Sequence, residues 1–189
     1  MDYTVLVNKD HLIKDSDLPK NLVIVGKMEQ PTIPIADGET DDVLLEEKAA
    51  KFFLEMMNDF NSTHSNKIAP DSGYRSIDRQ KRLLEYYYSI DGEKALTYSA
   101  MPRASEHHTG LAIDIALIVN GEYMDKITGE EKEIKDLISM CYKYGFILRY
   151  PKGKENITGF IYEPWHFRFV GLELAQKVHD SGLVLEEII

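Results

Sequence analysis

Two short segments carry most of the residues whose types and spacing suit chemistry. The first runs from Ser105 to Asp114 and contains His107 and Asp114 on either side of Gly110. Glycine can adopt a left-handed turn, so we expect both side chains to converge on one point. Imidazole and carboxylate groups are good ligands for a borderline metal such as zinc. Taken alone, the pair also fits a surface histidine beside a capping aspartate.

The second segment places Glu163 three residues before His166, in an aromatic stretch that is typical of a strand. A catalytic zinc keeps three protein ligands and an open position for water. The metal lowers the pKa of that water to about 7, and a nearby carboxylate then takes its proton. His107, Asp114 and His166 would supply the ligands, and Glu163 would act as the general base. Taken alone, this segment also fits an edge strand with a buried histidine.

Together the two segments resemble one protein family. The pattern S-x-H-x-x-G-x-A-x-D followed by E-x-W-H-x-R is similar to that of the VanY-type D-alanyl-D-alanine carboxypeptidases, zinc peptidases of the M15 group. A third family element, S-G-Y-R-S-x-x-x-Q, lies upstream, and the three elements span about Ser72 to Gly171. The matching positions are Ser72, Gly73, Tyr74, Arg75, Ser76, Gln80, Ser105, His107, Gly110, Ala112, Asp114, Glu163, Trp165, His166 and Arg168.

The resemblance implies one zinc ion per chain and roles for further residues. Arg75 would stabilise the oxyanion of the tetrahedral intermediate, a task suited to a fixed cation. Arg168 and Trp165 would support the ligands, with Arg168 orienting the strand or Glu163. Without the motif, Arg75 would be a surface ion pair and Gln80 a solvated helix position. Residues that would bind the substrate are Gln80, Ser105, Ser72 and Tyr74.

The resemblance also implies a substrate, a small peptide ending in D-Ala. The expected activity is that of a D,D-carboxypeptidase or D,D-dipeptidase acting on the D-Ala-D-Ala end of peptidoglycan precursors or on the free dipeptide. The chain looks most similar to the cytoplasmic dual VanXY type, which implies a role in glycopeptide (vancomycin) resistance. One rival is an L,D-carboxypeptidase that trims cell-wall tetrapeptides. Another is a non-catalytic zinc-binding module of the Hedgehog type, against which the presence of both Glu163 and Arg75 argues.

These residues need a scaffold, and the patterning predicts a single α+β domain over residues 1–189, with helices packed on an antiparallel sheet as in D,D-peptidases and Hedgehog domains. Residues 1–42 are expected to be loop-rich, and the catalytic core is expected at about 43–180. Asn120-Gly121 predicts a two-residue hairpin turn. The predicted helices are 43–60, 76–88, 134–141 and 172–180, and the predicted strands are 67–74, 111–119, 146–150 and 159–170.

Composition narrows the possible partners and location. The net charge is −10 and no Lys/Arg cluster appears, so nucleic acid is not expected as a partner. No apolar stretch reaches the roughly 18 residues of a membrane span, and the first residues lack a secretory signal. The single cysteine, Cys141, cannot form an internal disulfide. We therefore expect a bacterial cytoplasmic protein, or a membrane-anchored extracellular one if an anchor naturally precedes Met1; the oligomeric state is not predicted.

Overall fold

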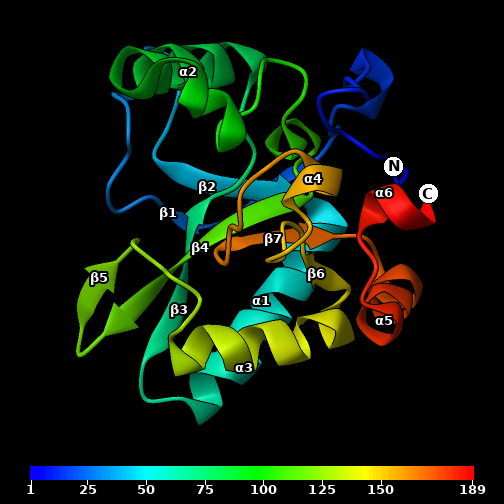
Figure 1. Cartoon of the computed structure of the whole chain (residues 1–189). Coiled ribbons are helices and arrows are strands. Elements are labelled where there is room, and N and C mark those ends of the chain that lie inside the picture. Colours follow the sequence, from blue (N-terminus) through cyan, green and yellow to red (C-terminus); the bar gives the residue numbers. More distant parts are fainter.

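The central antiparallel sheet brings together strands that are far apart in the sequence. The computed structural model describes residues 1–189, and its five-stranded sheet has the order β3-β4-β7-β6, with β5 beside β4 (Figure 1). The register of β4 pairs Asp114 directly with His166 on one side, and with Ser72 on the other. The strands are β3 (Lys67–Ser72), β4 (Ala112–Val119), β5 (Glu122–Met124), β6 (Phe146–Leu148) and β7 (His166–Phe169).

Strand β4 separates the hydrophobic core from the polar residues of the sheet. Ile113, Ile115 and Leu117 belong to the main hydrophobic cluster. Because side chains alternate along a strand, Ala112 and Asp114 point to the opposite face. Helix α1 (Glu47–Thr63) supplies a buried stripe to that cluster, and α3 (Lys132–Met140) adds further apolar side chains. The core therefore fixes β4 from one side and leaves Asp114 available on the other.

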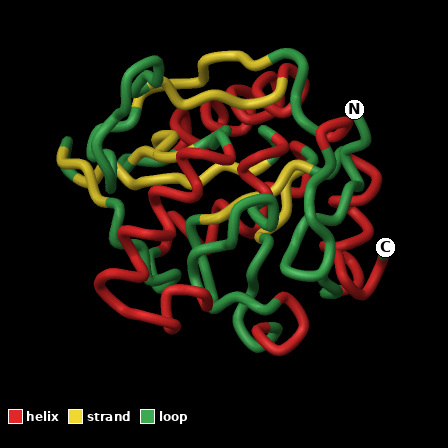
Figure 2. Tube along the Cα trace, turned by 90° about the horizontal axis from the view of Figure 1, so that it is seen from above, coloured by secondary structure: helices red, strands yellow, loops and turns green.

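Six α-helices surround the strands, and in Figure 2 helical segments lie on both sides of them. Helix α2 (Ile77–Asp91) begins where predicted, because the Ser76 hydroxyl accepts a hydrogen bond from the Arg79 backbone N–H. The remaining helices are α4 (Glu155–Thr158), α5 (Leu172–Ser181) and α6 (Leu185–Ile188). Short 3₁₀ turns cover Asp15–Asp17, Gly92–Thr97, Glu106–Thr109 and Cys141–Tyr144.

The predicted α+β fold is confirmed, but two element predictions were wrong. The helix predicted over 43–60 begins only at Glu47, because Asp42–Glu46 form strand β2. Strand β2 pairs with β1 (Leu22–Lys27), which lies in the segment expected to be loop-rich. Val43 and Leu45 of β2 are buried on one face, the period-two pattern of a strand. The predicted strand 159–170 is reduced to β7, because the chain turns at Pro164 and Trp165, and Pro164 has no N–H to donate to a ladder.

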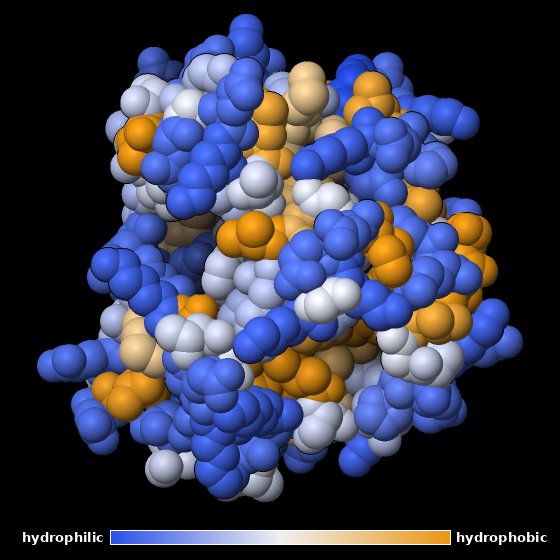
Figure 3. Space-filling view, in the orientation of Figure 1, coloured by the Kyte–Doolittle hydropathy of each residue, from blue (hydrophilic) through white to orange (hydrophobic).

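One face of the surface is largely polar, and the two ends of the chain lie close to each other (Figures 1, 2 and 3). The face in Figure 3 is largely hydrophilic, with hydrophobic side chains in separate patches. Cys141 is buried, as expected for a small apolar side chain. No helix combines the length and apolar character needed to span a membrane. The two chain ends lie on the same side of the molecule (Figures 1 and 2), where Asn8 donates a hydrogen bond to Glu186.

Candidate active site

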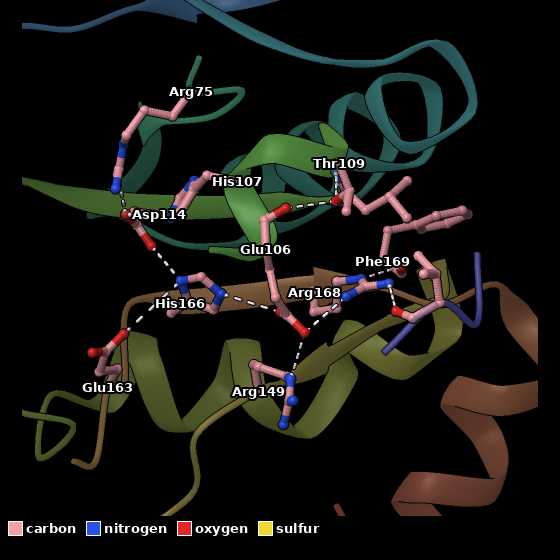
Figure 4. Close-up of polar contacts among 12 residues, drawn as sticks. Arg75, Glu106, His107, Thr109, Asp114, Arg149, Glu163, His166, Arg168 and Phe169 are labelled. Carbon is pink, nitrogen blue, oxygen red and sulfur yellow. Dashed lines mark hydrogen bonds and ion pairs between the residues drawn. The ribbon is translucent and has the colours of Figure 1, made fainter. Parts of the chain in front are cut away.

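The three predicted metal ligands meet at one point. Asp114 and His166 face each other across β4 and β7. His107 lies in the 3₁₀ turn before β4, which ends at Gly110 in the left-handed conformation (φ 67°). One ligand atom from each residue lies within 4.8 Å of the others (Figure 4). The structure therefore brings the three predicted ligands together in a group that could hold a metal ion.

The hydrogen bonds around the triad select which atoms would bind the metal. His107 Nδ1 lies 2.7 Å from the carbonyl oxygen of Gly73, to which it must donate its hydrogen. Its Nε2 is therefore free and lies 3.2 Å from Asp114 Oδ2. His166 presents Nδ1, which lies 2.9 Å from Asp114 Oδ1. Two imidazoles and one carboxylate, all largely buried, form a three-ligand set. A zinc ion held by three protein ligands keeps one coordination position open for water.

The electrostatics of the triad suit a cation. Burial lowers the pKa of His107 to about 4, and the nearby Arg75 contributes in the same direction. Burial would raise the pKa of Asp114, but the two histidines hold it well below its usual range. Burial would lower the pKa of His166, but Asp114 and Glu106 raise it to about 9. These carboxylates favour the protonated imidazole of His166, and metal binding at Nδ1 would compete with that proton.

Glu163 lies beside the triad without belonging to it. Its Oε2 is 3.9 Å from His166 Nδ1, and the residue is only 5% exposed. Burial raises the pKa of its carboxyl to about 8, with Asp114 adding to the rise and His166 opposing it. A carboxyl group with a perturbed pKa next to a metal site is well placed to transfer protons.

Arg75 is held with its guanidinium in the same cavity. Nη2 donates to Ser72 Oγ and Nη1 donates to Gln80 Oε1, both at 2.8 Å. Nη2 also lies 3.8 Å from Asp114 Oδ2. Gln80 is buried rather than solvated, and its Nε2 donates to the carbonyl of Ala100 at 2.7 Å. Both ends of this amide are therefore engaged within the protein, where they position Arg75.

The other predicted residues fall in different places. Ser105 and Trp165 line the cavity of the triad, whereas Tyr74 lines a separate cleft. Substrate contacts of Ser72, Tyr74, Gln80 and Ser105 remain predictions. Arg168 was predicted to orient either its strand or Glu163. It donates to the Phe169 carbonyl of its own strand, in line with the first role, but the carboxylate that it contacts is that of Glu106 rather than Glu163. The expectation that it orients Glu163 was wrong.

The space around the site extends on both sides of the triad. A cavity of about 490 Å³ holds His107, His166 and Glu163 in its wall. A neighbouring cavity of about 410 Å³ shares Arg75, Asp114 and Trp165 with it. Arg75 and Asp114 therefore lie at the junction of two spaces, so a substrate could extend in either direction from them.

Sequence reasoning missed Glu106, although it lies between Ser105 and His107 in the motif. Its carboxylate is fully buried, accepts hydrogen bonds from Arg149 and Arg168, and faces His166. These partners lie 43 to 62 residues away, so no local pattern identifies them. His108 is not a ligand, as predicted, because both of its ring nitrogens are engaged: Nδ1 lies 2.7 Å from the Arg75 carbonyl, and Nε2 accepts a hydrogen bond from the Arg103 backbone N–H at 3.1 Å.

A three-ligand metal site with a separate carboxylate and a buried arginine at one cavity defines a metallopeptidase-type active site. The model of the family described as VanY, D-alanyl-D-alanine carboxypeptidase, matches residues 42–172. The chain belongs to this family.

Two curated relatives illustrate the similarity. The putative carboxypeptidase YodJ of Bacillus subtilis is 40% identical over 96% of this chain, which spans 65% of that protein's length. The bifunctional D-Ala-D-Ala dipeptidase and carboxypeptidase VanXYC of Enterococcus gallinarum is 36% identical over 99% of the chain and 93% of the relative.

Solved structures agree with the fold. The LdcB LD-carboxypeptidase is 38% identical, with a TM-score of 0.79 over 96% of this chain and 83% of that one. An E175A mutant of the vancomycin resistance D,D-pentapeptidase VanY, in complex with Zn(II), is 26% identical. Its TM-score is 0.77 over 99% and 98% of the two chains.

Proposed function

We propose that this chain is a zinc-dependent D,D-carboxypeptidase that removes the terminal D-alanine from D-Ala-D-Ala ends of peptidoglycan precursors, or cleaves the free dipeptide. One observation carries the proposal: the ligand triad, Glu163 and Arg75 converge on a single cavity in a member of the VanY family. The relative VanXYC is both a D-Ala-D-Ala dipeptidase and a D-Ala-D-Ala carboxypeptidase, which supports this choice of substrates.

The residues present fit a zinc ion. His107 Nε2, Asp114 and His166 Nδ1 would hold it, with the donor types found in catalytic zinc sites. When bound, zinc polarises the scissile carbonyl and lowers the pKa of the attacking water. The related VanY structure with Zn(II) supports the choice of metal.

The chain's own residues supply the rest of the mechanism. Glu163 takes a proton from the attacking water and returns it to the nitrogen of the departing D-alanine. Arg75 donates hydrogen bonds to the oxygen of the scissile carbonyl as negative charge develops on it. Because Ser72 and Gln80 already hold the guanidinium, little reorganisation is needed during the reaction.

An L,D-carboxypeptidase is the second candidate, and the likeness to LdcB favours it. The two activities differ in the configuration of the residue before the scissile bond. The same triad, Glu163 and Arg75 would serve both reactions. The walls of the two adjoining cavities would therefore decide between them.

Three substrates separate these activities. Zinc-loaded protein is incubated with D-Ala-D-Ala, with a pentapeptide ending in D-Ala-D-Ala, and with a tetrapeptide ending in one D-Ala after an L-centre, and released D-alanine is measured. Turnover of the dipeptide or pentapeptide supports the proposal. Turnover of the tetrapeptide alone replaces it with the L,D activity, and no release from any of them refutes both.

We also propose a contribution to glycopeptide resistance, on the basis of the similarity to a vancomycin resistance VanY. The cytoplasmic location expected from the sequence is part of the same proposal. A longer, anchored protein is the alternative, since the chain spans 65% of YodJ. Fractionation of the native host tests the location. Raised vancomycin tolerance in a sensitive bacterium that expresses the chain, absent with E163A, tests the contribution to resistance.

A further inference from the structure

A charge network is buried behind the metal site. Glu106, Arg149 and Arg168 have no exposed side-chain surface. Glu106 Oε1 accepts hydrogen bonds from Arg149 Nε and Arg168 Nη1, both at 2.7 Å. The two remaining Arg149 nitrogens donate to the carboxylate of Glu186 at 2.6 and 2.9 Å. Two guanidinium cations thus meet two carboxylates, and the buried charges balance.

The free oxygen of Glu106 faces a metal ligand. Its Oε2 lies 3.6 Å from His166 Nε2, and neither buried atom has a hydrogen-bond partner elsewhere in the protein. Figure 4 shows the His166 ring between Asp114 and Glu106. Because Nδ1 of His166 faces the ligand Asp114 and would bind the metal, a neutral His166 ring must carry its hydrogen on Nε2. Glu106 is the group placed to receive that hydrogen.

Both ends of the chain close over this network. Arg168 Nη2 donates to the carbonyl oxygens of Val5 and Tyr3, at 2.7 and 3.2 Å. Glu186 lies in the last helix, α6, and also accepts a hydrogen bond from Asn8. The first and last segments are therefore connected to a metal ligand through a continuous chain of charged side chains.

We propose that Glu106 is a positioning residue that fixes His166 for metal binding, and that Arg149 and Glu186 hold Glu106 in place, so that closure of the chain ends sets the affinity of the metal site. A carboxylate that accepts the second N–H of a ligand histidine fixes the ring and its tautomer, and losing it typically lowers metal affinity about 10–100-fold. The inference rests on the proposed zinc chemistry of this site.

The test must separate positioning from folding. E106Q alone leaves the buried Arg168 guanidinium without a carboxylate, which destabilises the protein for reasons unrelated to the metal. E106Q/R168Q removes that cation as well and leaves the Arg149–Glu186 ion pair in place. Zinc affinity is measured by competition with a chromophoric chelator, and thermal unfolding of the metal-free proteins is followed in parallel.

We expect E106Q/R168Q to unfold at a higher temperature than E106Q, yet to bind zinc about 10–100-fold more weakly than the wild type. R168Q alone keeps the Glu106 carboxylate paired with Arg149 and should lose less zinc affinity than the double variant. Zinc binding by E106Q/R168Q at the wild-type affinity would overturn the positioning role and leave the network merely structural.

A matched pair on α6 tests the chain-end connection in proteins that keep the ligands and Glu106. E186Q removes the charge that pairs with Arg149. E187Q removes the charge of a partly exposed ion pair with Lys154 and keeps an oxygen that can accept the Val184 N–H. We expect E186Q to weaken zinc binding several-fold and E187Q to leave it unchanged. Equal affinities in the two variants would overturn this part. Because no substrate is involved, these outcomes are independent of whether the proposed peptide is cleaved.

Discussion

Removing the Arg75 side chain should slow catalysis without emptying the metal site. The guanidinium is 12% exposed, is held by Ser72 and Gln80, and lies 3.8 Å from the ligand Asp114. A cation fixed in this way contributes most when the carbonyl becomes tetrahedral. Losing one such donor raises the barrier by about 2.7–4 kcal/mol, so R75A should lower kcat by roughly 10²–10³-fold. R75K should also be poor, because lysine lacks the rigid fork.

Steady-state kinetics on the preferred peptide and metal analysis check this prediction. We expect KM to change much less than kcat, and zinc content to stay at the wild-type value. R82A is the matched control, since Arg82 lies on the same helix but pairs with Glu39 away from the triad. A steep rise in KM with unchanged kcat would refute the oxyanion role and indicate uniform substrate binding by Arg75.

Three further perturbations test separate parts of the account. E163A should retain stoichiometric zinc while kcat falls by roughly 10²–10⁴-fold; loss of the metal would instead make Glu163 a ligand or a structural group. In G73A, the added Cβ would collide with the Leu44 carbonyl oxygen and disturb the acceptor of His107. Both zinc affinity and the unfolding temperature should fall, and wild-type values for both would contradict this. Burial raises the pKa of Asp71 to about 6 despite a hydrogen bond from a tyrosine. Its neutral form is therefore favoured by folding, and the associated stability is lost as the pH rises from about 4 through 6. D71N should remove up to about 3 kcal/mol of this decrease in the free energy of unfolding. Urea unfolding of the wild type and D71N across this pH range measures the difference. Parallel pH profiles of the two proteins would contradict the assignment.

The sequence predicted the elements whose signals are local. Ser76 marked the start of α2 by its capping hydroxyl. Asn120 and Gly121 marked the hairpin, and both have the positive φ angles that such a turn requires. The metal ligands were found because each lies in a compact motif. These predictions needed no knowledge of distant partners.

What the sequence did not predict depends on contacts between distant segments. In β2, the adjacent Leu44 and Leu45 also fit a helical stripe, and only pairing with β1 decides for a strand. Glu106 appeared as an ordinary charged residue, since its role arises from Arg149, just after β6, and from Arg168 in β7. Likewise, the hydrogen bond from Gln80 Nε2 to the Ala100 carbonyl depends on the path of a loop 20 residues away.

Release of D-alanine as a function of bound zinc tests the central claim most directly. Metal-free protein is titrated with zinc in the presence of the pentapeptide ending in D-Ala-D-Ala or of D-Ala-D-Ala itself, and initial rates are measured. The account predicts no turnover without zinc and a rate that rises until one zinc per chain is bound, with E163A at least roughly 10²-fold slower throughout. Full turnover by protein shown to be free of metal, or no D-alanine release from the zinc-loaded enzyme, would contradict it.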